Sequence, residues 1–235
     1  ATGEFIKQTV YYPTPVTHEI FYTSDEGWLM LPNELSYGDY ELVEEVTAYG
    51  YVLDATPVPF RIDGEDAVVT VVKENVVQKG VIRLDKTGEI FHSVSETDGI
   101  YQPIYQTTGL AGAVFDVIAE EDVLTGDGTL RAAKGEIVDT ITTTESGAES
   151  KPLYLGRYRV VERECPEGMV LNVEEPVVEL TYAGQEVEIT STELGVYNER
   201  QKVAITFIKS LETDELFGIG QGEEFKAISF GLYAQ

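Results

Sequence analysis

The chain has 235 residues, and its 42 Asp and Glu against 16 Lys and Arg give a formal net charge of −26. Nucleic-acid binding is excluded, because it needs clustered positive charge to displace counterions from phosphates. Apolar residues make up 43% of the chain, enough for a folded core, but no apolar run approaches the roughly 20 residues of a membrane-spanning helix. The single cysteine, Cys165, excludes an intramolecular disulfide, so a secreted domain of this sequence must be stabilised in another way.

Alternation of apolar and polar residues is the main secondary-structure signal, and it predicts half-buried β-strands. In chain order the clearest strands are expected at residues 81–86, 114–117, 158–161 and 187–190. Glycine-containing pairs predict tight turns between them, for example at Asp127-Gly128 and Ala183-Gly184. Only residues 119–124 have a pattern compatible with a helical turn. Short strands separated by such turns predict an all-β fold, either a sandwich or a barrel.

The sequence contains an internal repeat, defined by sets of matching residues. The offset is 123 between Asn75, Gln78 and Lys86 and their counterparts Asn198, Gln201 and Lys209. The offset is 118 between Gly38, Tyr40 and Glu44 and their counterparts Gly156, Tyr158 and Glu162. Phe115 and Ala119 recur as Phe230 and Ala234. Three parts are therefore predicted: the C-terminal part of one repeat at 1–78, a complete repeat at 79–202, and the N-terminal strands of a further repeat at 203–235. We expect the chain to be a fragment of a longer protein.

The central repeat resembles the CnaB/SpaA-like, prealbumin-type repeats of Gram-positive bacterial surface proteins. The resemblance is carried by a first strand ending in a lysine (residues 80–86, GVIRLDK), a second strand (residues 110–115, LAGAVF), a glutamate-containing E-box (residues 153–169, LYLGRYRVVERECPEGM) and a closing strand (residues 195–198, GVYN). Cys165 and Met169 depart from the family pattern, in which an alanine and an aromatic residue are usual. The resemblance implies a CnaB-type, reverse immunoglobulin-like β-sandwich with an isopeptide bond between Lys86 and Asn198, catalysed by Glu162.

The strand pattern independently favours a meeting of these three residues. Lys86, Glu162 and Asn198 each extend an apolar row of an alternating strand, so each is expected to face inward. Burying such groups without partners is costly, so we expect them to meet. A site shielded from water favours a neutral amine and a protonated acid, and the amine of Lys86 would then attack the side-chain amide of Asn198 with loss of ammonia. The alternative is a buried ion pair between Lys86 and Glu162 without a covalent bond.

The flanking parts contain a second, divided triad. Glu44 and Asn75 occupy the catalyst and acceptor positions of the first part, and Lys209 occupies the donor position of the last. One hypothesis is that Lys209 of one chain reacts with Asn75 of the next, with Glu44 as catalyst, so that chains join head to tail. The alternative is a longer polypeptide that is interrupted within one flexible loop. Lys73 would share a face with Asn75, which departs from the pattern of the central repeat.

Other residues that often carry function lack a supporting pattern. His18 and His92 have no partner at metal-binding or triad spacing, and residues 122–128 lack the ligand spacing of an EF-hand loop. Residues 101–105 (YQPIY) are expected as an aromatic loop that could contact a ligand, within an insertion at residues 91–109. We therefore expect no cofactor, no metal site and no enzyme activity beyond a single self-modification.

The family resemblance implies a structural repeat of a bacterial cell-surface stalk, fibre or adhesin. Such a protein is extracellular, associated with the cell wall or with a fibre. Its expected partners are neighbouring repeats or further copies of itself, because repeats of this kind contact their neighbours in a one-dimensional array. The alternative is an adhesin module that binds a host protein or glycan, for which residues 91–109 are the expected contact surface.

Overall fold

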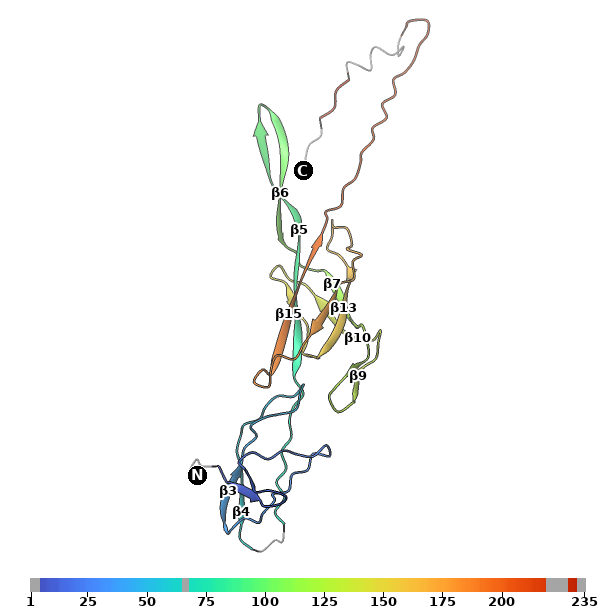
Figure 1. Ribbon diagram of the computed structural model, residues 1–235. Helices are drawn as coiled ribbons and strands as arrows, with labels where there is room; N and C mark the ends of the chain where they lie inside the picture. Colours follow the sequence, from blue (N-terminus) through green and yellow to red (C-terminus); the bar gives the residue numbers. More distant parts are fainter. Residues whose placement is uncertain (1–4, 65–67, 219–227, 232–235) are drawn as a thin grey trace. The chain divides into compact units, whose positions relative to one another are not determined.

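The computed structural model describes residues 5–64, 68–218 and 228–231 (Figure 1). The chain forms two compact units, Ala1–Arg200 and Gln201–Gln235. The described residues contain strands and no helix, which confirms the all-β prediction and shows that the helical turn expected at residues 119–124 is wrong. The strands are β1 (Gln8–Val10), β2 (Val16–His18), β3 (Gly38–Leu42), β4 (Val58–Ile62), β5 (Lys79–Thr97), β6 (Ile100–Gly109), β7 (Val114–Ala119), β8 (Val123–Leu124), β9 (Leu130–Ala132), β10 (Ile137–Thr142), β11 (Ala148–Glu149), β12 (Leu153–Tyr154), β13 (Gly156–Glu164), β14 (Val177–Leu180) and β15 (Ile189–Asn198).

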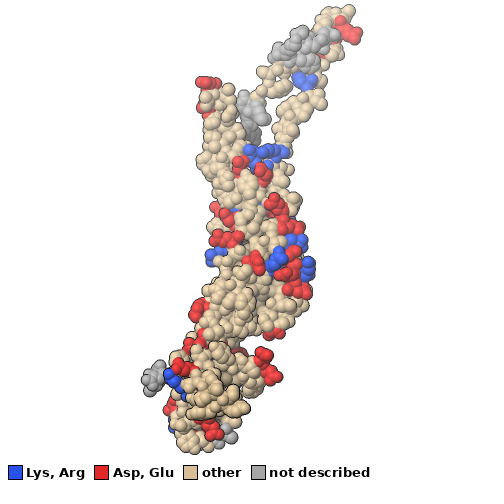
Figure 2. All heavy atoms as spheres, viewed as in Figure 1, with Lys and Arg blue, Asp and Glu red and all other residues tan. Residues whose placement is uncertain are grey.

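The surface is acidic, with Asp and Glu spread over it and the fewer Lys and Arg lying among them (Figure 2). Several of these charges form exposed ion pairs, for example Arg83 with Glu149 at 3.0 Å and Arg159 with Glu175 at 2.8 Å. Exposed pairs of this kind contribute only about 0–1 kcal/mol each to stability. The stability of the fold must therefore come from its interior. No helix in the described part of the chain is long and apolar enough to span a membrane.

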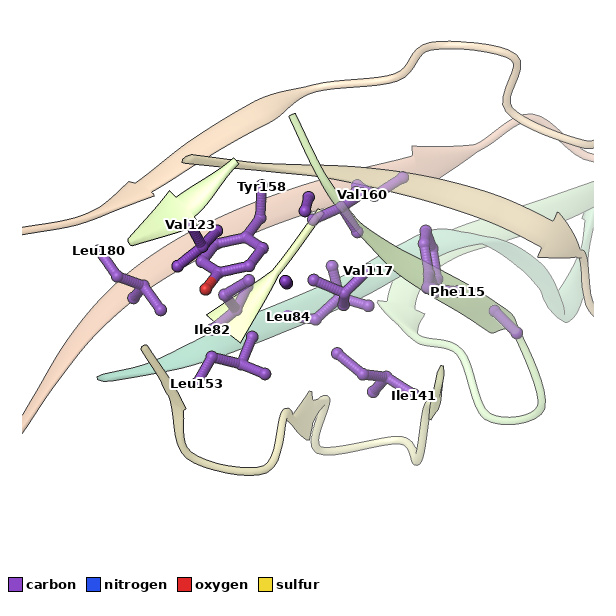
Figure 3. Packing of buried hydrophobic residues seen from close by; sticks show 14 residues of the cluster. Ile82, Leu84, Phe115, Val117, Val123, Ile141, Leu153, Tyr158, Val160 and Leu180 are labelled. Atoms are coloured by element: carbon purple, nitrogen blue, oxygen red, sulfur yellow. The ribbon is translucent and has the colours of Figure 1, made fainter. Parts of the chain in front are cut away.

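Two sheets of the central repeat enclose the core. One has the strand order β10-β7-β13-β14, and the other is centred on β5, which pairs with β6, β11, β12 and β15. Ile82 and Leu84 of β5 pack in one cluster with Phe115 of β7 and with Tyr158 and Val160 of β13 (Figure 3). None of these five side chains is more than 2% exposed. Full burial of an apolar side chain contributes about 1.5–3 kcal/mol, so this cluster is the main source of stability in the sandwich.

The first and last strands of the central repeat, β5 and β15, pair in parallel. In this register Val196 lies opposite Lys86, and Asn198 lies opposite Gly88. Alternate residues of a strand face the same side of the sheet, so Lys86 and Asn198 lie on the inner face of neighbouring strands, two positions apart. The register thereby places the predicted amine and acceptor in adjacent positions at one end of the core.

The first part of the chain repeats half of this sandwich. β3 pairs with β4 as β13 pairs with β14, with Gly38 opposite Ile62 where Gly156 is opposite Leu180. The tyrosines at matching positions make the same hydrogen bond to the carbonyl oxygen four residues earlier, at 2.8 Å for Tyr40 and 2.6 Å for Tyr158.

Counterparts of β5 and β7 are not found next to this half-sandwich among the described residues. Residues 68–75 alternate between exposed and half-buried, as β15 does in the central repeat, but they pair with no described strand. The side chain of Leu42 on β3 is 37% exposed, whereas its counterpart Val160 is 1% exposed. The inner face of the first part is therefore only partly covered.

β5 continues beyond the core and forms a long hairpin with β6. The tip is Asp98-Gly99, and both residues have positive φ angles, 53° and 76°. The segment at residues 101–105 lies on strand β6, so the prediction of an aromatic loop there is wrong. The ring of Tyr105 contacts that of Phe91 at 6.3 Å between centroids, and the guanidinium of Arg200 stacks on Tyr105 at 3.6 Å.

The second compact unit, Gln201–Gln235, contains no assigned strand in its described residues. The rings of Phe207 and Phe230 stack within it at 5.9 Å. Ala234, which belongs to the predicted repeat, lies outside the described residues. The division of the chain into parts 1–78, 79–202 and 203–235 stays a prediction.

Candidate functional site

The predicted triad of the central repeat comes from three strands of the two sheets. Lys86 lies on β5 and Asn198 on β15 of one sheet, whereas Glu162 lies on β13 of the other. The three residues are 0%, 1% and 3% exposed for Lys86, Asn198 and Glu162 respectively. The structure therefore brings together all three residues that the sequence singled out, in a site shielded from water.

One carboxylate connects the members of this site. Oε1 of Glu162 lies 3.2 Å from Nζ of Lys86, a charge contact that lacks hydrogen-bond geometry. Oε2 of Glu162 accepts a hydrogen bond from Nδ2 of Asn198 at 2.8 Å and another from the backbone N–H of Asn172 at 2.8 Å. Nδ2 of Asn198 also donates to the carbonyl oxygen of Val170 at 2.6 Å. Glu162 thus touches both the amine and the amide nitrogen.

The surroundings of Lys86 favour its neutral form. Burial lowers the pKa of Lys86 below its usual value of 10.5, and the negative charge of Glu162 opposes this shift. On another side, the ring of Phe115 lies 5.5 Å from Nζ. Nζ of Lys86, Oε1 of Glu162 and Oδ1 of Asn198 are buried without a hydrogen bond. Such unsatisfied groups are uncommon in folded proteins, and a reactive site is one of the settings in which they occur.

Glu44 and Asn75 of the first part form the same arrangement without a lysine. Nδ2 of Asn75 donates to Oε2 of Glu44 at 2.7 Å and to the carbonyl oxygen of Val52 at 3.0 Å. The backbone N–H of Asp54 donates to the same Oε2 at 3.1 Å. At the repeat offset of 118, Val52 and Asp54 correspond to the two backbone partners in the central site. Both side chains of this pair are only half-buried.

The two lysines considered for this second pair lie in different compact units of the chain. Lys73 donates to the carbonyl oxygen of Thr56 at 2.6 Å and lies 3.4 Å from Asp54, so its amine is already engaged. Lys209, the predicted donor, has an exposed side chain in the second compact unit. The structure thus shows Asn75 hydrogen-bonded to Glu44 at this position, and the roles of these two residues and of Lys209 stay predictions.

Sequence reasoning missed the backbone groups of both sites, which are an N–H that donates to each carboxylate and a carbonyl oxygen that accepts from each asparagine amide. The signal was present, because Gly50-x-Val52 and Gly168-x-Val170 match at the offset of 118, but a main-chain donor has no residue type of its own. Among the other predicted residues, the His18 ring lies 6.5 Å from that of Phe21, and His92 is exposed. Within the described ranges, no three metal-binding side chains form a cluster.

Comparisons with known proteins agree with this architecture. The family model of the SpaA prealbumin-like fold domain matches residues 7–76 and 103–194. No match is found among curated proteins. Similar solved structures include the Bacillus anthracis TIE protein, with 24% identity, a TM-score of 0.50 and coverage of 85% of this chain and 32% of that chain. The major pilin subunit of Bacillus cereus has 21% identity, a TM-score of 0.32 and coverage of 53% and 30%. The minor pilin of Streptococcus agalactiae has 14% identity, a TM-score of 0.35 and coverage of 75% and 66%.

The chain spans about a third of the length of the first two of these structures. The two matched segments include β3 and β4 in the first part and strands from β6 to β15 in the central repeat, and together they make up more than half of the chain. The CnaB-type fold expected from the E-box and its flanking strands is therefore confirmed, and the chain belongs to the SpaA family of prealbumin-like fold domains.

Proposed function

We propose that the central repeat is a self-cross-linking structural unit of a Gram-positive cell-surface fibre or stalk. The observation that carries this proposal is the contact of Glu162 with two nitrogens, Nζ of Lys86 and Nδ2 of Asn198, in a buried site. Transfer of a proton from the lysine to the carboxylate yields a neutral amine and a protonated acid, as the low polarity of the site favours.

The reaction then follows from these contacts. Nζ of Lys86 attacks Cγ of Asn198, and a C–N bond forms between them. Oε1 of Glu162 accepts a proton from the amine, and Oε2, which is 2.8 Å from Nδ2, delivers one to the leaving nitrogen. The Cγ–Nδ2 bond breaks and ammonia leaves, so the products are one secondary amide and one ammonia. Glu162 ends as the protonated acid with which this step began, and the proton that it first took from the lysine ammonium then leaves with the ammonia as ammonium, so each molecule reacts once.

The cross-link would close a loop of more than a hundred residues between β5 and β15. By analogy with a disulfide, the lost chain entropy of the unfolded state is worth roughly 4–5 kcal/mol. Because β5 and β15 are parallel neighbours, a bond between them also prevents their separation when the ends of the repeat are pulled apart. A disulfide-free surface domain gains its resistance to extension and proteolysis in this way.

Intact-mass measurement of the purified chain tests the bond. We expect a mass lower than that of the plain sequence by one ammonia, and the full mass for Lys86→Ala and for Glu162→Ala. Tyr40→Phe is a control that leaves the central site unchanged and keeps the deficit. A wild-type mass equal to the plain sequence would contradict the proposal.

A second function, head-to-tail joining of copies, is favoured by the arrangement of Glu44 and Asn75. This pair has the hydrogen bonds of the central site, and the described residues around it supply no lysine that contacts it. We infer that Lys209 of a second copy supplies the missing amine, by the same reaction with loss of ammonia. The donor strand would lie beside residues 68–75, as β5 lies beside β15.

Denaturing gels of the boiled full-length chain test this joining. We expect a ladder of covalent oligomers, abolished by Asn75→Ala and by Lys209→Arg. Asn198→Ala is the matched control, because it removes the central acceptor and leaves the ladder. A wild-type chain that runs only as a monomer at high concentration would contradict head-to-tail joining.

Adhesion to a host protein or glycan is the alternative, and the β5–β6 hairpin favours it. Phe91, Ile100 and Tyr101 on this hairpin are 57%, 63% and 66% exposed, and exposed aromatic residues often anchor interfaces. Binding of the full chain to arrays of glycans and matrix proteins tests this function. Binding that is lost in Tyr101→Ala would support it, and absence of binding by the wild type would exclude it for the ligands tested.

A further inference from the structure

The loop after the E-box runs beside the end of the closing strand β15 before it turns away. The backbone N–H of Val170 in this loop donates to the carbonyl oxygen of Glu199 at 2.7 Å. In an antiparallel ladder the same bond recurs two residues further along each segment. The N–H of Asn172 would therefore be expected to donate to the carbonyl oxygen of Tyr197.

Asn172 replaces this expected bond by one from its own side chain. Nδ2 of Asn172 donates to the carbonyl oxygen of Tyr197 at 3.2 Å. Oδ1 of Asn172 accepts from the backbone N–H of Glu174 at 2.8 Å, which forms an Asx turn. The backbone N–H of Asn172 donates to Oε2 of Glu162 at 2.8 Å instead of joining the ladder. The side chain of this asparagine thus occupies the acceptor that its own N–H would otherwise take.

The N–H of Asn172 helps to fix the carboxylate on which the proposed reaction depends. Oε2 of Glu162 accepts from this N–H and from Nδ2 of Asn198, so two hydrogen bonds hold this oxygen on the side of the acceptor amide. Oε1 then faces the amine of Lys86 at 3.2 Å. Reacting groups that are held in the correct geometry react much faster than groups that must first find it. Loss of the N–H would let the carboxylate rotate away from both nitrogens.

The first part of the chain has the same backbone arrangement with a different side chain. The N–H of Val52 donates to the carbonyl oxygen of Val76 at 2.9 Å, which starts the same ladder. Asp54 is the counterpart of Asn172 at the offset of 118. Its N–H also leaves the ladder and donates to Oε2 of Glu44 at 3.1 Å. The backbone donor is therefore directed at the carboxylate in both sites.

The carboxylate of Asp54 cannot donate a hydrogen bond, and it is held by a cation instead. Oδ1 of Asp54 accepts from the N–H of Thr56 at 2.9 Å, which forms the Asx turn, and Oδ2 lies 3.4 Å from Nζ of Lys73. Hydrogen bonds from Thr56, and then the ammonium of Lys73, hold the pKa of Asp54 below its usual value of 3.8, so it is charged at neutral pH. Lys73 lies two residues before Asn75, the predicted acceptor. In both sites this side chain therefore ties the loop to the segment that carries the asparagine.

We propose that Asn172 and Asp54 are positioning residues, whose side chains bind the segment of the acceptor asparagine so that their backbone N–H groups are directed at Glu162 and Glu44. The proposal rests on the proposed cross-linking reaction and adds to it two residues outside the triads. It also assigns a role to Lys73, as the cation that allows an aspartate to act where the central repeat has an asparagine.

The rate of ammonia loss after synthesis tests Asn172. The full chain is made by cell-free translation, samples are stopped in acid and denaturant, and the fraction that has lost ammonia is followed by intact mass. We expect Asn172→Ala to slow the reaction about tenfold, because its N–H returns to Tyr197 and Glu162 loses a charge-assisted hydrogen bond. Glu174→Ala is the matched control, since it keeps the N–H that Asn172 binds, and its rate should equal that of the wild type. Equal rates for Asn172→Ala and the wild type would overturn the inference.

An NMR signature separates positioning from a loss of stability. In the Asn198→Ala background, which forms no cross-link, the amide proton of Asn172 should shift when Glu162 is changed to Gln, because its acceptor is then uncharged. The shift should be several-fold smaller in Asn172→Ala, and an equal shift in both chains would overturn the inference. If the wild type loses no ammonia, the cross-linking proposal fails, whereas this signature still decides whether the side chain of Asn172 directs its N–H.

Lys73 provides an independent test in the first part. Lys73→Met should make the amide proton of Asp54 insensitive to Glu44→Gln, because the loop is no longer tied to the neighbouring segment. Adding Asp54→Asn to Lys73→Met should restore the response, because an asparagine can donate to the carbonyl oxygen of Glu74, the counterpart of Tyr197. A response that persists in Lys73→Met, or one that Asp54→Asn does not restore, would overturn the inference for this site.

Discussion

The protonation of one buried group in the central site, the amine of Lys86, should change the stability of the fold. In an Asn198→Ala chain this amine has no acceptor and stays unreacted. Its pKa is lowered by burial from the usual 10.5, so between the lowered value and 10.5 the unfolded chain binds more protons than the folded one. The free energy of unfolding of Asn198→Ala should therefore rise with pH through this window. Urea denaturation at a series of alkaline pH values measures the slope.

The control is the double variant Lys86→Met, Asn198→Ala, which has no amine at this position. Every other titratable group is the same in both chains, so the difference between the two slopes reports on Lys86. Equal slopes would show that the amine of Lys86 is not held in its neutral form. If the wild type carries the proposed cross-link, it should resemble the double variant, because an amide nitrogen does not titrate.

The triad residues could be predicted from sequence because each extends an apolar row, and a buried polar or charged group needs a partner. The main-chain partners of these residues could not be predicted from sequence. Every residue has a backbone N–H or carbonyl oxygen, so only the folded loop shows that the N–H of Asn172 donates to Glu162 and that the carbonyl oxygen of Val170 accepts from Asn198. The contact of Lys73 with Thr56 was also not predicted, since alternation alone places this lysine beside Asn75.

Among the elements, the β5–β6 hairpin depends on one close approach where it joins the sandwich. A Cβ atom on Gly109 would lie 1.8 Å from the carbonyl oxygen of Glu145, whereas a Cβ on Gly195 would meet nothing within 4 Å. Gly109→Ala should lower the free energy of unfolding by about 2–3 kcal/mol, because backbone must move to admit the methyl group. Gly195→Ala should change it by about 0.5 kcal/mol or less.

Urea denaturation in the Asn198→Ala background measures both effects without the cross-link. Equal midpoints for the two alanine variants would contradict the close approach.

The sequence predicted a strand only at residues 81–86 of this hairpin region, although β5 extends to Thr97. From Ile90 onward most residues of the strand are exposed, so no buried face imposes the alternation that reveals a strand, and a bulge between Phe91 and Ser93 also shifts the register. The match of Gly38 and Tyr40 to the E-box placed the residues of β3 in the expected repeat, whereas no strand was predicted at β4.

For the whole molecule, the net charge of −26 opposes the approach of one copy to another. Salt screens this repulsion, since the Debye length falls from about 30 Å at 0.01 M to about 10 Å at 0.1 M ionic strength. Head-to-tail ladder formation should therefore become several-fold faster over this range. The loss of ammonia within the central repeat involves no approach of two chains and should keep its rate. Gels and mass spectrometry on the same samples measure both reactions, with sodium and potassium chloride compared at equal ionic strength. A ladder that slows as salt is raised would show that attraction between local charges, and not net repulsion, governs the encounter.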